Sequence, residues 1–456
     1  MRTHPVPIPD LDEPIPGSVL PRLRSFGFRF LHVVDAVSLF ALMHVITTAR
    51  FGLNWPTYPY SYYFVGFSLA TAIHLSIYYF GGMYEYEQRL GRPPWLPKAT
   101  FLTAVAVLVG ASTAFITGRY LMPRGNLGAL FVAGSLLVTF NRWFARSVRF
   151  RRFGAPKILL VGTPDDAGLA KRHLGESGRG ETVVGHVVST DRLVAQIDEV
   201  DATDVLLVSG GSLDDIYPHP LDVLERRLIG VYRRVVPVDT LLGLQRSREI
   251  AGMPFVALRT HAVPMYRLRL KRIIDLAFLI VAFPIIMVVF GATALYTRIR
   301  VGPGVIFRQE RVGRRGELFT LVKFRTMGHD AESATGATLA ADGDPRVVRG
   351  MSWIRSSRLD ELPQLWNVWR GEMSIVGPRP ERPEFVDQFE ELLPGYNRRH
   401  DMPPGITGLA QIRGHYQTDP GYKLGHDLQY IVNWSPILDV MIMAETVVVM
   451  LRRSAR

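Results

Sequence analysis

Two adjacent carboxylates, Asp360 and Glu361, lie in the segment 359–368 (LDELPQLWNV) and are the residues of this sequence best suited to chemistry. Pro363 suits the first turn of a helix, so the pair is expected at a helix N-terminus, where free backbone N–H groups favour negative charge. Asp360 is then expected to stay ionised at neutral pH. An acidic pair in this position is more often a simple cap, so its surroundings must decide between capping and catalysis.

Cations suited to phosphate oxygens lie on three short segments elsewhere in the chain. These segments are 309–313 (QERVG), 323–327 (KFRTM) and 377–382 (GPRPER). Arginine offers phosphate a fixed fork of donors, and lysine offers a point charge. Two carboxylates beside such cations fit metal-assisted phosphoryl transfer, in which one carboxylate is the nucleophile and the other holds Mg²⁺. The candidate phosphate-binding residues are Gln309, Arg311, Lys323, Arg325 and Arg379.

The composition narrows the class of protein. The chain has 456 residues and no cysteine, which excludes disulfide frameworks, thiol nucleophiles, iron–sulfur clusters and Cys-based zinc sites. Its 53 Lys and Arg residues exceed its 41 Asp and Glu residues, and the resulting charge of +12 suits a phosphate-bearing partner. Hydrophobic residues make up 48% and the mean hydropathy is +0.12, which is high for so charged a chain. These values indicate membrane segments.

Four long apolar stretches lie in the first third of the chain, each near the ~20 residues that cross a bilayer as a helix. Basic residues precede the first stretch, separate the second from the third, and follow the fourth between Arg142 and Lys157. This pattern predicts that both ends of a four-helix transmembrane unit, residues 28–150, face the cytoplasm, behind a polar tail of residues 1–27 without a signal-peptide pattern. The stretches are Phe28–Ala49, Tyr62–Met83, Phe101–Met122 and Leu127–Ala145.

Four ionisable residues fall at membrane depth within these stretches. Such a residue is a functional candidate. No partner carboxylate and no metal-ligand spacing accompanies these four, so contacts between helices are the preferred interpretation. The residues are His32, Asp35, His44 and His74.

Residues 155–260 alternate short apolar strands with helical stretches, which predicts a doubly wound, Rossmann-like α/β domain. Its first turn has one glycine, Gly162, followed by Pro164, Asp165 and Asp166. A dinucleotide site needs more glycines, and carboxylates repel pyrophosphate. We therefore expect no nicotinamide cofactor, but a scaffold that supports a homodimer. The expected strands are 157–162, 182–188, 204–209 and 233–238, and the expected helices are Ala167–Leu174, Leu193–Val200 and Leu221–Ile229.

Residues 267–456 form the candidate catalytic domain and begin with a fifth apolar segment, Ile273–Leu295 (273–295), between two basic clusters. Symmetric basic flanks and Pro284 at its middle favour a re-entrant helix–break–helix hairpin with both ends on one side of the membrane. A fifth span with a kink is the alternative. Pro436–Leu451 is apolar but short and predicts an interfacial helix, and Gly336–Gly343 predicts a mobile loop.

The region from Lys271 to Arg453 resembles the bacterial sugar transferases, or polyprenyl-phosphate hexose-1-phosphate transferases. The resemblance rests on many motifs in the same order, and the preceding spans and degenerate α/β domain are similar to the large, full-length members of that family. The motifs are KRIID (271–275), GPGVIFRQERVG (302–313), KFRTM (323–327), LDELPQLWNV (359–368), GEMSIVGPRP (371–380) and PGITGLAQIRG (404–414), followed by Asp427, Tyr430 and Asp439.

The resemblance implies a membrane protein of α plus α/β class with a four-helix transmembrane unit, a doubly wound α/β domain and a mostly helical catalytic domain carrying the hairpin. It implies transfer of hexose-1-phosphate from a UDP-sugar to polyprenyl (undecaprenyl) phosphate at the cytoplasmic face of the bacterial inner membrane. UMP would be released in this first membrane step of polysaccharide or glycan synthesis. The expected partners are donor, acceptor and bilayer, with no nucleic acid.

The family's site residues carry over by motif. Asp360 would attack the sugar-bearing phosphate and form a covalent phosphosugar intermediate, and Glu361 would bind Mg²⁺. Asp427 would belong to the catalytic surroundings. Lys323, Arg325 and Arg379 would contact phosphates.

Three positions depart from the common family pattern, and none belongs to the dyad. Phe283 and Arg358 stand where serine is common, and Val348 stands where threonine is common. A membrane-anchored nucleotide-sugar dehydratase or epimerase is an alternative function, but residues 157–260 lack the Gly-rich turn and the Tyr-x-x-x-Lys pair it needs. A non-catalytic assembly factor is a third reading, against which the complete dyad argues. UDP-glucose and UDP-galactose are both open as donors.

Overall fold

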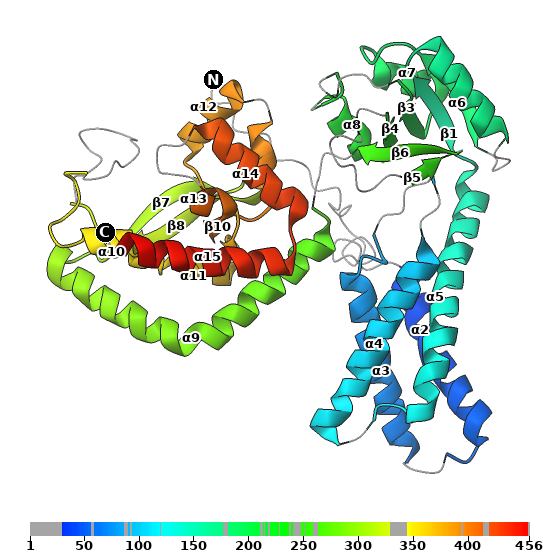
Figure 1. Ribbon diagram of the computed structural model, residues 1–456, viewed down its shortest axis with the longest axis horizontal. Coiled ribbons are helices and arrows are strands. Elements are labelled where there is room, and N and C mark those ends of the chain that lie inside the picture. The colour runs from blue at the N-terminus through cyan, green and yellow to red at the C-terminus, as the bar shows by residue number, and fades with distance from the viewer. Residues whose placement is uncertain are drawn as a thin grey trace, which may run out of the picture. The chain divides into compact units, whose positions relative to one another are not determined.

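The computed structural model describes residues 30–454, apart from gaps at 56–58, 86–89, 92–93, 119, 177–180, 210–212, 214, 218, 228, 237–238, 240–247, 251, 259–262, 329–343, 394 and 414–418. The predicted tail 1–27 and the predicted loop 336–343 lie outside the described residues. The chain divides into two compact units between residues 260 and 261, and each is described by itself (Figure 1).

Four apolar helices open the first unit: α2 (Phe30–Phe51), α3 (Tyr60–Phe80), α4 (Trp95–Thr117) and α5 (Arg124–Phe153). They confirm the four predicted helices, although their ends differ by several residues. Together with α9 of the second unit, they are long and apolar enough to cross a membrane. Helix α5 runs on through the basic cluster to Phe153, eight residues beyond the predicted end at Ala145, so Arg142, which was counted among the loop charges, lies inside the helix. Arginine is a good helix former and does not end a helix.

A buried ionic cluster joins these helices around Asp35 of α2. Arg142 of α5 donates to both carboxylate oxygens of Asp35, at 2.7 and 2.6 Å, and the two side chains are 3% and 0% exposed. Asn141 and Tyr84, in the turn after α3, donate to the same carboxylate at 2.9 and 2.7 Å. The interpretation of Asp35 as a contact between helices is confirmed, and its partner is an arginine that the sequence pattern assigned to a loop.

The α/β domain follows α5 and contains a six-stranded sheet in the order β2-β1-β3-β4-β6-β5. The first four strands are parallel, and β6 and β5 are antiparallel to their neighbours. The strands are β1 (Lys157–Val161), β2 (Thr182–Val187), β3 (Asp204–Leu207), β4 (Gly230–Arg234), β5 (Arg248–Ile250) and β6 (Met253–Leu258). The helices are α6 (Pro164–Glu176), α7 (Leu193–Val200) and α8 (Leu221–Arg226).

Helices cover both faces of this sheet, so the predicted doubly wound arrangement is confirmed. Alternate residues of β1 enter two separate cores, one with α6 and the other with α7 and α8. Two details of the prediction are wrong. The fourth strand begins at Gly230 rather than at residue 233, and the β5–β6 hairpin was not expected. The strand was predicted too late in the chain because the prediction followed the Val-rich run after Arg233. Apolar content does not mark the residue at which hydrogen bonding to the neighbouring strand begins.

The turn after β1 holds a closed polar network around Asp166. Its carboxylate accepts from Thr163 Oγ1 at 2.9 Å, from Ser209 Oγ at 2.8 Å and from Arg234 Nη1 at 2.9 Å. The donors at this edge of the sheet therefore bind a carboxylate of the chain itself. That arrangement supports the expectation that no pyrophosphate binds here, which stays a prediction.

The second unit begins with helix α9 (Met265–Val301), followed by the antiparallel hairpin of β7 (Ile306–Val312) and β8 (Leu318–Phe324). Strands β9 (Ser374–Val376) and β10 (Gly405–Thr407) pair in parallel. The remaining helices are α10 (Ser352–Ser356), α11 (Gln364–Arg370), α12 (Pro383–Leu392), α13 (Leu409–Arg413), α14 (Pro420–Asn433) and α15 (Pro436–Ser454), with 3-10 turns η2 (Arg314–Gly316), η3 (Leu359–Glu361) and η4 (Tyr396–Asp401).

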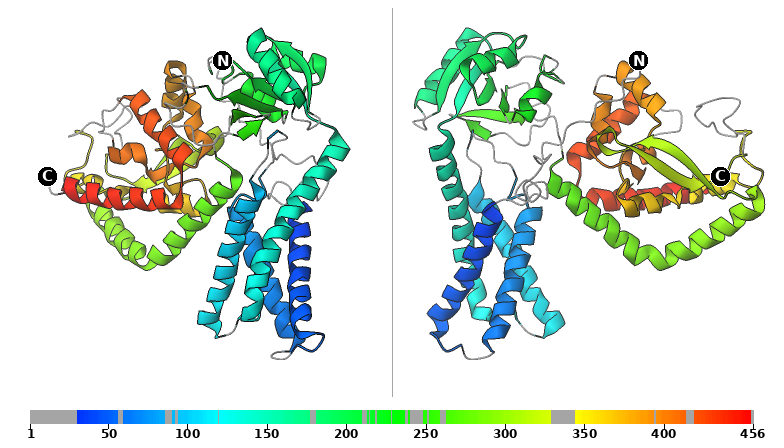
Figure 2. Two further views of the ribbon diagram at one scale, coloured as in Figure 1. Left: turned by 45° about the vertical axis from the view of Figure 1, so that its right-hand side comes forward. Right: turned by 180° about the vertical axis from the view of Figure 1, so that it is seen from behind.

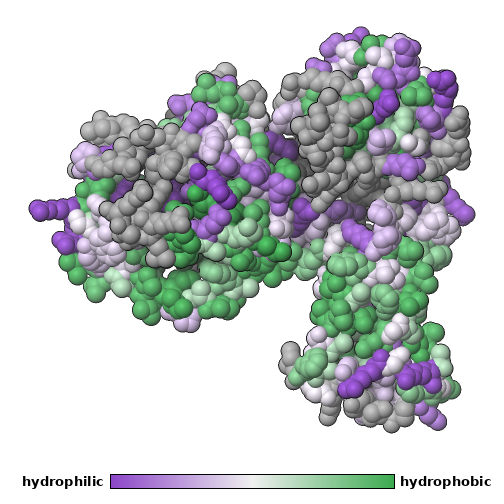
Figure 3. Space-filling view, viewed as in Figure 1, coloured by the Kyte–Doolittle hydropathy of each residue, from purple (hydrophilic) through white to green (hydrophobic). Residues whose placement is uncertain are grey.

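Helix α9 is continuous over 37 residues and contains Pro284. Figures 1 and 2 show it bent near its middle. Proline removes one backbone donor and its ring presses on the preceding turn, so a bend at this place is expected. The predicted interruption of the helix is thus replaced by a bend. Hydrophobic residues gather along the outer surface of α9 in the view of Figure 3.

Buried polar contacts fasten the first half of α9 to the rest of the unit. Lys271 Nζ lies 2.7 Å from Asp439 Oδ2, and both side chains are nearly inaccessible to solvent. Asp439 also accepts from Tyr430 OH at 2.7 Å. Asp275 accepts from Ser374 Oγ at 2.7 Å and from the backbone N–H of Ile375. The KRIID motif therefore anchors the membrane helix to the catalytic fold.

Candidate active site

The dyad lies in the 3-10 turn η3, directly before α11. Pro363 is the N-cap of α11, so Asp360 and Glu361 stand outside the helix and not in its first turn. Asn367 of α11 fixes this segment against β8, because its amide group donates to Thr320 O at 2.8 Å and accepts from Val322 N at 3.2 Å. The short helix thereby holds the dyad beside the β7–β8 hairpin.

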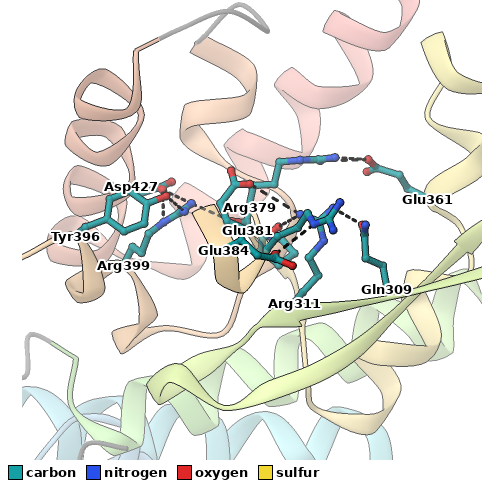
Figure 4. A network of polar contacts seen from close by, with 11 residues as sticks. Gln309, Arg311, Glu361, Arg379, Glu381, Glu384, Tyr396, Arg399 and Asp427 are labelled. Carbon is teal, nitrogen blue, oxygen red and sulfur yellow. Dashed lines mark hydrogen bonds and ion pairs between the residues drawn. The ribbon is translucent and has the colours of Figure 1, made fainter. Parts of the chain in front are cut away.

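Glu361 is almost fully buried and is paired with Arg379. Its Oε1 accepts from Nη1 and Nη2 of Arg379 at 3.1 and 3.2 Å (Figure 4). Burial alone would raise the pKa of Glu361, but the guanidinium groups of Arg379 and Arg358 hold it below its usual value. Glu361 is therefore ionised. The Arg379 side chain is 40% exposed, which leaves part of its guanidinium accessible to a substrate.

The backbone segment that carries Arg379 packs closely against a second segment that also contains glycine. Gly377 N–H donates to Thr407 O, and Gly405 N–H donates to Pro378 O, both at 2.8 Å. A Cβ on Gly405 would lie 2.0 Å from Gly377 N, so no larger residue fits at that position. The GPRP and PGITG motifs thus form one backbone unit that carries Arg379 toward the dyad.

Asp360 lies in a cationic surrounding. Burial raises the pKa of its carboxyl to about 7, and the charge of Glu361 adds to the rise. Three cations oppose that rise: Lys323, Arg355 and Arg379. Burial in turn lowers the pKa of Lys323 to about 8, against the attraction of Asp360. Because η3 lies outside α11, the surrounding cations rather than the first turn of a helix favour the ionised form of Asp360. Its ionisation at neutral pH stays a prediction.

Arg355 and Arg358 belong to the same surrounding and were not predicted as site residues. Arg355, on α10, donates to Thr326 Oγ1 at 3.3 Å. Arg358 precedes the dyad with a positive φ of 55°, and its Nη1 is buried without a hydrogen-bond partner among the described residues. The sequence feature that could have identified them is their spacing from Asp360, since the segment WIRSSRLDE places two cations within five residues of the dyad.

The other predicted phosphate ligands differ in availability. Lys323 belongs to the cationic surrounding of Asp360, and its ammonium also lies 5.0 Å from the Phe307 ring centre. Arg311 donates to Gln309 Oε1 at 2.7 Å and to Pro380 O at 3.2 Å, so both predicted residues are engaged with the protein itself (Figure 4). Arg325 follows β8, and its backbone N–H donates to Val305 O.

Asp427 is not in contact with the dyad. It forms a buried ion pair with Arg399 of η4, with Asp427 Oδ2 2.8 Å from Arg399 Nη2 and side chains that are 2% and 4% exposed. Arg399 also donates to the Tyr396 hydroxyl and, at 2.9 Å, to Arg379 O. Figure 4 shows Arg379 between this pair and Glu361. Asp427 therefore holds Arg399, which in turn contacts the backbone carbonyl of Arg379.

The dyad fits a magnesium ion on chemical grounds. Glu361 Oε2 is buried and has no hydrogen-bond partner among the described residues, so one carboxylate oxygen is available. The described part of the chain contains no cluster of three or more His, Asp or Glu side chains suited to a metal. Mg²⁺ commonly binds through one or two carboxylates, water and substrate phosphate oxygens, and needs no larger protein cluster.

Comparison with known proteins agrees with this geometry. The family model "Bacterial sugar transferase" matches residues 266–453, which include every residue of the site. A UDP-N-acetylgalactosamine-undecaprenyl-phosphate N-acetylgalactosaminephosphotransferase of Aeromonas hydrophila is 42% identical over 187 residues, 40% of this chain and 44% of the relative. A UDP-glucose:undecaprenyl-phosphate glucose-1-phosphate transferase of Klebsiella pneumoniae is 41% identical over 211 residues, 44% of each chain.

These two matches span less than half the length of the relatives. An uncharacterized sugar transferase of Bacillus subtilis is 39% identical over 178 residues, and this match spans 85% of that relative and 39% of this chain. Because the family model matches residues 266–453, which include the dyad, and this relative is matched over 85% of its length, the chain belongs to the bacterial sugar transferase family.

Proposed function

We propose that the protein transfers hexose-1-phosphate from a UDP-sugar to a polyprenyl phosphate and releases UMP. The observation that carries the proposal is the dyad itself: a partly buried aspartate beside an arginine-paired glutamate, with several cations around it. The printed names of the relatives from Aeromonas and Klebsiella describe the same class of reaction. The dehydratase or epimerase alternative is not favoured, because the turn after β1 is filled by Asp166 and its partners.

In the proposed first step, an oxygen of Asp360 attacks the sugar-bearing phosphorus of the donor. The bond from this phosphorus to the UMP oxygen breaks, and UMP leaves with the electron pair. Lys323, Arg355 and Arg379 lie where they would neutralise the phosphate oxygens, which lets a carboxylate approach an anionic ester. Glu361 holds Arg379 and would hold Mg²⁺, which when bound supplies further positive charge to the phosphates.

In the proposed second step, a phosphate oxygen of the polyprenyl phosphate attacks the same phosphorus. The bond between this phosphorus and Asp360 breaks, a diphosphate bridge to the lipid forms, and the aspartate is regenerated. Because UMP departs before the lipid reacts, the kinetics should be ping-pong. The test is UMP release by the purified full chain with a panel of UDP-sugars. No UMP with any donor would contradict the proposal, and release that needs no acceptor in the first turnover would support it.

We also propose that Glu361 is the magnesium ligand. Glu361→Gln keeps the shape of the side chain but removes its charge, so Mg²⁺ should bind more weakly and turnover should fall by roughly 10²-fold or more. Titration of activity with Mg²⁺ checks this, because the half-saturating concentration should rise in the variant. An unchanged magnesium dependence would assign the metal to other groups.

The membrane arrangement is a further part of the proposal. Helices α2–α5 would span the bilayer, and α9 would enter and leave on the cytoplasmic side of the bacterial inner membrane. The bend at Pro284 and the basic residues at both ends of α9 support the re-entrant form. Self-association through the α/β domain remains a prediction of the sequence.

Cysteine labelling tests this topology cleanly, because the chain has no cysteine of its own. Glu317, exposed between β7 and β8, should be shielded from an impermeant thiol reagent in intact cells when replaced by cysteine. Leu53, 81% exposed beyond α2, should be labelled in the Leu53→Cys variant. Labelling of both variants in intact cells would mean that α9 crosses the membrane.

Replacement of Pro284 should weaken the bend. In Pro284→Ala the backbone N–H is restored. Alanine is also more favourable than proline in a helix interior, by about 3 kcal/mol of free energy. A straighter α9 would favour a full span, so we expect lower activity and partial outside labelling of the Glu317→Cys variant. Wild-type activity together with wild-type labelling would show that packing alone sets the bend.

A further inference from the structure

An apolar pocket of about 810 Å³ lies between α9, the β7–β8 hairpin and the segment that starts two residues after Asp360. Cavities of this size commonly enclose small ligands or a segment of a larger one. The lining is almost entirely apolar. Its residues are Leu279, Ile280, Phe283, Ile286, Met287, Phe290, Ile306, Arg308, Val322, Leu362, Pro363, Leu365, Trp366 and Trp369.

The hairpin separates this pocket from the polar site. In its register Phe307 pairs with Lys323, and Arg308 pairs with Val322. Side chains alternate between the two faces of a strand. Lys323 therefore faces the dyad side, while Arg308 and Val322 face the pocket, where both contribute to its lining. Asp360 does not itself line the pocket, but the pocket reaches Leu362, two residues after it.

The pocket opens onto the apolar outer surface of the unit. Ile280, Phe283 and Met287 of α9 are 63%, 58% and 51% exposed, and Trp366 and Trp369 of α11 are 59% and 52% exposed. Figure 3 shows the hydrophobic surface along α9. A ligand entering from this side would come from a lipid phase and not from water.

Arg308 is the one charged residue among those that line the pocket. No hydrogen bond or ion pair of its side chain occurs within the described residues. A cation in an otherwise apolar wall favours an amphiphile with an anionic head. In a polyprenyl phosphate the phosphate is joined directly to the chain, so charge and isoprenoid lie next to each other, as Arg308 and the apolar wall do. A phospholipid has a glycerol between its phosphate and its chains.

We propose that this pocket holds the isoprenoid segment nearest the phosphate of the acceptor, with Arg308 pairing with that phosphate. The inference rests on the proposed function and adds the route of the second substrate. Donor and acceptor reach Asp360 from opposite faces of the hairpin. The incoming phosphate oxygen forms the new bond to phosphorus, the bond to Asp360 breaks, and no additional reactant is needed.

The test separates the two half-reactions in the full chain reconstituted in nanodiscs. Met287→Trp fills the pocket and Arg308→Gln removes its charge. Both should leave the first-turnover release of UMP unchanged and raise the apparent KM for undecaprenyl phosphate. For Arg308→Gln the rise should be about tenfold, as expected from the loss of one charged contact, and Met287→Trp should raise the KM because the indole occupies the space of the isoprenoid. Ile285→Trp is the matched control, since Ile285 is 72% exposed on α9 and does not line the pocket, and its KM should equal that of the wild type.

The outcomes distinguish failure of this inference from failure of the proposed function. An unchanged KM in both Met287→Trp and Arg308→Gln, with normal UMP release, would overturn the pocket alone. A loss of UMP release in these variants would also overturn it, because the pocket would then serve the donor. Absence of UMP release in the wild type would overturn the proposed function.

A photoreactive polyprenyl phosphate provides a second readout. It should crosslink to peptides of α9 and α11, and excess undecaprenyl phosphate should prevent the crosslinking. Equal protection by phosphatidylglycerol would identify a general lipid site and contradict the assignment to the acceptor.

Discussion

Asp360→Asn should reduce turnover by roughly 10³-fold or more, because an amide is a far poorer nucleophile than a carboxylate of the same shape. The wild-type protein, incubated with Mg²⁺ and a UDP-sugar radiolabelled in the sugar, should retain label on the protein when no acceptor is present. The Asn variant should retain none. Label that survives denaturation and is released by undecaprenyl phosphate would identify the covalent intermediate.

The matched control for this experiment is Asp387→Asn on α12, an exposed carboxylate outside the site. It should label and turn over like the wild type. Equal labelling of the Asp360→Asn variant would move the nucleophile elsewhere, and Glu361 would be the next candidate. Intact folding of Asp360→Asn is checked by its unfolding temperature, which should stay close to that of the wild type.

Asp427→Ala should destabilise the catalytic unit by about 3–5 kcal/mol, because it leaves Arg399 buried without its counter-ion. Arg399 also supports the backbone carbonyl of Arg379, so the loss should extend to turnover. Thermal unfolding of the full chain in detergent, followed by tryptophan fluorescence, measures the first effect. Glu445→Gln is the control, since its ion pair with Arg413 is exposed and should contribute less than ~1 kcal/mol.

A second variant, Asp427→Glu, distinguishes a positioning role of Asp427 from a catalytic role. If Asp427 acts through Arg399, Asp427→Glu should recover much of the stability and the activity together. A strong loss of activity in Asp427→Glu at wild-type stability would mean that the carboxylate touches substrate.

The apolar helices were predictable because hydrophobic length is a direct consequence of bilayer thickness. Their ends were not, since a hydropathy pattern stops at the first arginines of α5 while helix formation continues to Phe153. The β5–β6 hairpin was missed because its first strand has three residues and Pro254 stands in its second. Proline inside a strand normally argues against that strand.

The dyad and Arg379 were predicted because the LDELPQLWNV and GPRP segments match family motifs, whereas adjacent carboxylates alone recur elsewhere, as at Asp165 and Asp166. Arg355 was missed although it stands five residues before Asp360, because the fold of α10 decides whether its side chain lies near that carboxylate. The sequence also does not show which charged side chains form contacts within the protein itself. Arg311 is engaged by Gln309, and Asp427 by Arg399, which lies 28 residues earlier in the chain.

The ion pair of Asp35 and Arg142 has a consequence for biogenesis. The two residues are 107 positions apart, so the ribosome delivers the carboxylate of α2 long before the guanidinium of α5. If α2 spans the membrane, it carries an uncompensated acid until then, at a cost below the about 2.5–3.5 kcal/mol of a charge at the centre of a span, because Asp35 lies in the second turn of α2. A nascent chain that stops short of α5 would therefore hold α2 loosely and present it to membrane proteases. We therefore expect completion of α5 to supply the missing counter-ion and to fix α2 among its neighbouring helices.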